Sequence, residues 1–142
     1  MDPREFLKIA SGLLVVGTPG ANRSAISRAY YAAFNVGVEK LRGLGFNVRR
    51  GAAAHGEVVH CLNNAGDPDI AGVGLRLTDL HTLRNRADYQ LDKLDVEQPA
   101  TAFAAQISST AAIEAMDRNF SGSQTAVLKT AIAAWRRANG YP

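Results

Sequence analysis

The apolar residues of this chain recur mostly at intervals of three and four, and no segment competes seriously as a strand with alternating positions. This spacing places the apolar side chains of a segment on one face of an α-helix. Proline and capping residues open several segments, and glycine-rich stretches separate them. The pattern predicts six helices, the first starting at Asp2-Pro3 and ending before Gly17, and the others covering about residues 21–41, 53–63, 68–94, 99–120 and 125–139.

These helices predict an all-α fold, an antiparallel helical bundle that forms one domain over residues 1–142. A chain of 142 residues with 46% apolar and 20% charged residues is long enough and apolar enough to bury one core. We expect the last helix to be an addition at about residues 123–139 that docks through one apolar face. That face carries Val127, Leu128, Ala131, Ile132 and Trp135.

Charge and cysteine content narrow the classes of function only slightly. The formal net charge of +3 permits an RNA or phosphate ligand without requiring one. Cys61 is the only cysteine, which excludes an intrachain disulfide and a cysteine metal cluster. The N-terminus is acidic where a signal peptide has a basic region, and the early apolar run "LLVV" is too short to span a bilayer. We therefore expect a cytoplasmic protein with no membrane partner.

The second predicted helix contains two adjacent tyrosines, and a helical wheel assigns them to different faces. Tyr30 falls in the apolar arc, where its hydroxyl needs a hydrogen-bond partner. Tyr31 falls at the edge of a polar arc that also contains Arg28 and Asn35. Several alanines and a glycine in the same helix allow a neighbouring helix to approach closely. We expect Tyr31 and Asn35 to lie in the interface of a homodimer that packs on the second and fourth helices.

The segment "RSAISRAYYAAFNVG" resembles the signature helix of the HEPN superfamily of small helical bundles. Two later segments, "AAHGEVVH" and "LRNRADY", agree with this family in sequence order. The resemblance covers about residues 4–117, so the last helix lies outside it. Many HEPN proteins are metal-independent ribonucleases, often toxins paired with a minimal nucleotidyltransferase antitoxin. The resemblance therefore implies a dimeric bundle, RNA as a ligand and a nucleotidyltransferase-like protein as a partner.

HEPN ribonucleases share a motif in which an arginine, usually followed by a polar residue, precedes a histidine. Arg84 and Asn85 match the first half of this motif, but Tyr89 occupies the histidine position. A free phenol loses its proton only near pH 10, which makes tyrosine a poor base at neutral pH. In an undistorted helix Arg84 and Tyr89 lie about 140° apart, which predicts that they meet only through a bend or across a dimer.

A second set of residues does share a face of the fourth helix. His81, Arg84 and Asp88 lie within about 60° of one another, where Arg84 could hold a phosphate, His81 could transfer a proton and Asp88 could orient either one. The alternative is that Arg84 and Asp88 form an ordinary surface ion pair. We take Arg84, His81, Tyr89 and Asp88 as candidate catalytic residues, and Arg84, Asn85 and Arg28 as candidate phosphate-binding residues.

Two functions remain open from the sequence. One is a toxin-type ribonuclease that acts as a homodimer, with His81 or Tyr89 replacing the missing histidine. The other is a non-catalytic HEPN module that binds RNA, a nucleotide or a nucleotidyltransferase-like protein through the same groove. No metal or cofactor is expected, because no residues show ligand spacing and no phosphate-binding glycine loop is present. His55 is expected to start a helix or to pack.

Overall fold

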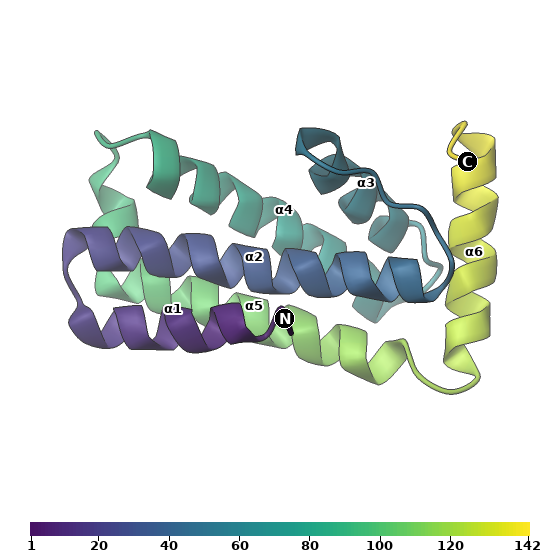
Figure 1. The fold of residues 1–142 in the computed structure, drawn as a ribbon, viewed down its shortest axis with the longest axis horizontal. Coiled ribbons are helices and arrows are strands. Elements are labelled where there is room, and N and C mark those ends of the chain that lie inside the picture. The colour runs from purple at the N-terminus through teal and green to yellow at the C-terminus, as the bar shows by residue number, and fades with distance from the viewer.

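Helices make up all of the regular structure in the computed structural model, which describes residues 1–142. The all-α prediction is therefore confirmed. None of the helices combines the length and the apolar character needed to cross a membrane. The elements, shown in Figure 1, are α1 (Glu5–Val16), α2 (Pro19–Gly43), α3 (Ala52–Asn63), α4 (Pro68–Tyr89), the short 3-10 helix η1 (Leu94–Glu97), α5 (Pro99–Asn119) and α6 (Gln124–Ala138).

Helix α2 is the central element of the bundle, and it packs against α1, α3, α4 and α5 (Figure 1). Five of its fifteen buried residues are alanine, which lets the neighbouring helices approach closely. At Gly37 an added Cβ would lie only 3.1 Å from Cγ1 of Val58 in α3. Helices α3 and α4 are closer still, because a Cβ at Gly74 would come within 2.0 Å of the side-chain oxygen of Asn63. A side chain at Gly37 would require Val58 to shift by a few tenths of an ångström, and one at Gly74 would require the Asn63 side chain to move away.

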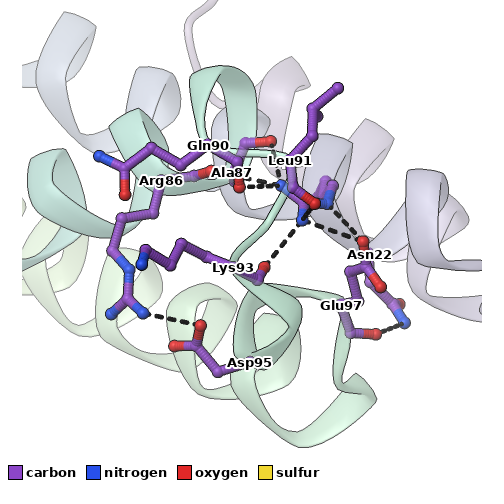
Figure 2. A network of polar contacts seen from close by, with 9 residues as sticks. Asn22, Arg86, Ala87, Gln90, Leu91, Lys93, Asp95 and Glu97 are labelled. Carbon is purple, nitrogen blue, oxygen red and sulfur yellow. Dashed lines mark hydrogen bonds and ion pairs between the residues drawn. The ribbon is translucent and has the colours of Figure 1, made fainter.

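Arg23 in α2 contacts the chain at the end of α4, and Figure 2 labels the residues that surround its guanidinium. Its buried guanidinium donates hydrogen bonds to the backbone carbonyls of Arg86, Ala87, Gln90, Leu91 and Lys93 and pairs with Glu97 at 2.9 Å. The last carbonyls of a helix have no partner within the helix, so a cation placed there satisfies them and stabilises the helix end. The prediction that this helix continues to about Leu94 was wrong, because the chain turns around Arg23 after Tyr89.

The first two helices also begin at different residues from those predicted. Asp2 and Pro3 form a separate turn in which the Asp2 carboxylate accepts the N–H of Arg4 at 2.9 Å, and α1 starts at Glu5. Helix α2 starts at Pro19 because the hydroxyl of Thr18 accepts the N–H of Ala21 at 3.2 Å. Thr18 and the following proline thus act as a helix start, although Gly17 and Gly20 in the sequence indicated a longer break.

Helix α6 crosses one end of the bundle (Figure 1), and a buried ion pair attaches it there. Arg136 is 2% exposed and Glu57 of α3 is 0% exposed, and their side chains meet at 2.7 Å. The other oxygen of Glu57 pairs with Arg49 at 2.9 Å. Burial by itself raises the pKa of Glu57, but the hydrogen bonds from Arg136 and Arg49 outweigh it and hold the pKa below its ordinary value. The predicted docking of the last helix is confirmed, although Val127 remains exposed.

Replacing Arg136 by alanine should strongly destabilise the protein. The change leaves the Glu57 carboxylate buried with only the more exposed Arg49 as a partner, and removing one member of a buried pair costs about 3–5 kcal/mol. Urea unfolding followed by circular dichroism measures the loss. Arg137→Ala is the matched control, because Arg137 is exposed on the same helix and should change stability by less than about 0.5 kcal/mol. Equal losses in both variants would contradict the structural role of the pair.

Candidate functional site

Arg84 lies between the rings of two tyrosines at the C-terminal part of α4. Its Cζ atom is 5.1 Å from the ring centres of both Tyr31, on α2, and Tyr89, the last residue of α4. Nη2 donates to the Tyr31 hydroxyl at 2.6 Å and to the Tyr89 hydroxyl at 3.2 Å. The Arg84 side chain is only 13% exposed, whereas Tyr89 is 69% exposed. A cation is thus held just beneath two phenol hydroxyls at the surface.

The remaining nitrogens of Arg84 contact other side chains of the same face. Nη1 donates to the side-chain oxygen of Asn85 at 3.0 Å. Nε lies 3.0 Å from a carboxylate oxygen of Asp88, close enough for an ion pair, although the N–H does not point at that oxygen. The hydroxyl of the buried Ser27 donates to the same oxygen at 3.0 Å. The ion pair is half-buried and tied to α2, so it is more than an isolated pair on the surface.

Two stacked histidines adjoin this cluster. The rings of His81 on α4 and His55 on α3 are 4.8 Å apart and nearly parallel, at 10°. The hydroxyl of Tyr30 contacts Nδ1 of His55, and the Tyr30 ring stacks on both histidines. Nε2 of His81 lies 3.5 Å from the side-chain nitrogen of Asn85, which connects the histidines to Arg84. The predicted core position of Tyr30, with a partner for its hydroxyl, is confirmed.

Burial and neighbouring charge keep both histidines neutral at physiological pH. Burial is the main reason that the pKa of His81 is lowered, and the positive charge of Arg84 lowers it further. Burial also lowers the pKa of His55, with contributions from His81 and Arg84. Burial raises the pKa of Tyr30, so its phenol stays protonated and can donate to Nδ1 of His55. A neutral imidazole has a free ring nitrogen that can accept a proton.

The structure brings most of the predicted site residues together within one chain. The prediction that Arg84 and Tyr89 meet only through a bend or across a dimer was wrong, because α4 ends at Tyr89 and the two long side chains fold toward each other. Arg28 lies over the rings of Phe6 and Tyr31, at 5.2 and 5.3 Å. Asn35 does not contact Arg84, and its side-chain nitrogen donates to the backbone oxygen of Tyr31 at 2.8 Å.

His55 belongs to this site, although the sequence did not identify it as a site residue. It lies in the first turn of α3 and packs on Phe34, as its position in the sequence indicated. Only the crossing of α3 over α2 and α4 brings it against His81. The segment "AAHGEVVH" stands far from "LRNRADY" in the sequence, and helical spacing within one segment cannot reveal a contact between two helices.

A pocket of about 400 Å³ opens beside the cluster, between α2, the loop that follows it and the start of α3. Tyr31 and His55 belong to both the pocket wall and the cluster. The remaining lining residues are Phe34, Asn35, Val38, Arg42, Arg49, Arg50, Gly51 and Ala54. Three cations and no carboxylate therefore line it.

The site contains no group of three or more histidine, cysteine, aspartate or glutamate side chains that could hold a metal ion. Comparisons with known proteins add no family to this description. No family model matches the chain, and neither the curated proteins nor the solved structures contain a match.

The two histidines should make the protein less stable in mild acid. Their folded-state pKa values lie below those of unfolded histidine, so in this range the unfolded chain binds more protons. The free energy of unfolding should therefore fall as the pH drops from about 7.5 to about 5.5. Urea unfolding across this range measures the slope, which should be smaller in His81→Gln. His60→Gln, which changes an exposed histidine outside the cluster, is the control and should keep the original slope.

Proposed function

We propose that this chain is a toxin-like HEPN protein that binds RNA and cleaves it without a metal ion, as a homodimer. The observation that carries the proposal is the Arg84 guanidinium, held beneath two tyrosine hydroxyls and next to a pair of neutral histidines. The resemblance of "SRAYYAAF" and "LRNRADY" to HEPN sequences agrees with it.

The geometry around Arg84 suits a phosphate group. Tyr31 and Tyr89 each accept a hydrogen bond from Arg84, so the O–H of each remains available to donate outward. The guanidinium stays cationic at any working pH and can support negative charge that develops on phosphate oxygens. A phosphodiester at this surface would receive two phenol hydrogen bonds backed by a fixed positive charge.

Cleavage would use the RNA's own 2′-hydroxyl as the nucleophile. A base takes the proton of this hydroxyl, its oxygen attacks phosphorus, and the bond to the 5′-oxygen breaks as that oxygen is protonated. The products are a 2′,3′-cyclic phosphate and a 5′-hydroxyl. His81 suits the role of base because it is neutral, whereas His55 already contacts Tyr30 through Nδ1. The exposed Tyr89 hydroxyl suits protonation of the leaving oxygen.

A non-catalytic module that binds RNA, a nucleotide or a nucleotidyltransferase-like protein is the alternative. Two observations favour it. Tyr89 replaces the histidine of the HEPN ribonuclease motif, and the carboxylate of Asp88 lies 3.0 Å from Arg84, where it offsets part of the positive charge. The two functions differ in one respect that can be measured, because only the first produces a cyclic phosphate.

Arg84→Ala should abolish RNA cleavage, or weaken RNA binding by about 1–3 kcal/mol if the protein only binds. Arg84→Lys should recover only part of the function, because an ammonium cannot hold both phenol oxygens and a phosphate in one plane. Gel analysis of a labelled RNA, with detection of the cyclic phosphate, measures cleavage. Arg118→Ala, which removes an exposed charge from α5, is the control.

Two further variants test which side chains transfer protons during cleavage. His81→Ala and Tyr89→Phe should each reduce the cleavage rate while RNA binding is retained, if the side chain transfers a proton. Cleavage should persist in EDTA. If Arg84→Ala leaves RNA binding and cleavage unchanged and lowers only the melting temperature, Arg84 is structural and the proposed function is wrong.

The homodimer should form through the surface where α2 and α4 meet. Tyr31 and Asn35 lie on this part of α2, and two copies related by a twofold axis would bring two Arg84 clusters together. Light scattering at micromolar concentration should give twice the mass of the 15.1 kDa chain. Asn35→Arg, which adds bulk and like charge near the axis, should shift the mass toward the monomer. A monomeric wild-type protein would contradict this part of the proposal.

A further inference from the structure

The pocket beside the Arg84 cluster has the charge of a site for a polyanion. Arg42 and Arg50 are exposed at its edge, and their side chains make no hydrogen bond or ion pair within the chain. Arg49 differs, because it is engaged with Glu57 at 2.9 Å and with the Tyr141 hydroxyl at 3.2 Å. Two of the three cations are therefore free to bind a ligand, and no lining carboxylate competes with it.

Contacts with α3 and α6 hold in place the loop that carries Arg49 and Arg50, whereas Arg42 belongs to α2. Arg136 of α6 donates to the backbone oxygen of Asn47 at 3.0 Å, and the N–H of Arg49 donates to Glu57 at 3.2 Å. The Arg136 guanidinium also lies over the ring of Phe46, at 5.3 Å. The pocket is thus formed before any ligand arrives, which reduces the ordering cost of binding.

The wall of the pocket is partly aromatic, through Tyr31, Phe34 and His55. Aromatic faces and edges beside free arginines are the combination that binds single-stranded nucleic acid, in which a base leaves its neighbours and packs on a ring. The volume of about 400 Å³ lies within the usual range of small-ligand sites. A nucleotide in a duplex could not enter, because its base is stacked and paired.

We propose that this pocket binds one nucleotide of a single-stranded RNA next to the phosphate at Arg84. Arg42 and Arg50 contact its phosphate, and the aromatic wall contacts its base. The shared Tyr31 joins the two positions, since its ring lines the pocket and its hydroxyl binds Arg84. The inference rests on the proposed function, to which it adds the preference for an unpaired strand.

The test uses a short fluorescein-labelled RNA carrying 2′-O-methyl groups, which binds but cannot be cleaved, and follows its anisotropy at several salt concentrations. The double variant Arg42→Ala/Arg50→Ala should bind at least about tenfold more weakly. The slope of log affinity against log salt should fall by about 1.4, because each contact to a single strand contributes about 0.7. Arg118→Ala/Lys129→Ala is the matched control, since it removes two exposed charges outside the pocket.

The other outcomes separate the inference from the proposed function. RNA binding that depends on Arg84 but is equal in the two double variants overturns the pocket and leaves the proposed function standing. Equal affinity for the same sequence as a duplex overturns the preference for a single strand. Absence of RNA binding by the wild-type protein overturns both. If a labelled acidic peptide binds instead, and the pocket variant loses it, the ligand is a protein segment and the inference is wrong.

Discussion

The hydrogen bonds from Arg23 to the chain beyond α4 fix the geometry on which the candidate site depends. Five backbone carbonyls around the end of α4 accept from this one guanidinium, and Glu97 balances its charge. Because the helix stops at Tyr89, that side chain is free of helical neighbours on its C-terminal side and folds back to Arg84. A residue of α2 thus positions a pair of residues on α4 without contacting either side chain.

The number and order of the helices follow from the sequence, because the spacing of apolar residues and the proline and glycine signals are local. The different positions of Tyr30, in the core, and Tyr31, at the polar face, follow for the same reason, because both residues lie on one helix. The C-terminal end of α4, the Glu57–Arg136 pair and the place of His55 do not follow. Each depends on a contact between segments far apart in the chain, and an arginine in a helix looks the same in the sequence whether it is buried or exposed.

The arginines of this protein differ in what occupies their donors, and this separates structural from functional ones. Arg23 bonds chiefly to carbonyls, and Arg136 to a carboxylate and two carbonyls, groups that cannot donate onward to a ligand. Arg84 also contacts the Asn85 oxygen and the Asp88 carboxylate, but its Nη2 bonds to two hydroxyls, each of which keeps a proton to donate. Arg42 has no internal partner. If burial were the only criterion, Arg23 and Arg136 would be the first candidates for a functional arginine. The chemistry of their hydrogen-bond partners indicates instead that Arg84 is the arginine placed to bind an anion.

Arg84 also links phosphate binding to proton transfer. Its charge is one reason that the pKa values of His81 and His55 are lowered, so the group that would hold the phosphate also favours the neutral imidazole that would accept a proton. A bound phosphate would bring negative charge beside the same histidines and favour their protonated form. The histidines would therefore be better bases before the phosphate binds and better acids afterwards. The carboxylate of Asp88 already lies 3.0 Å from Arg84 and offsets part of its charge. Burial remains the main reason that both histidines are neutral, so a bound phosphate would adjust a protonation state that the packing of the two rings already determines.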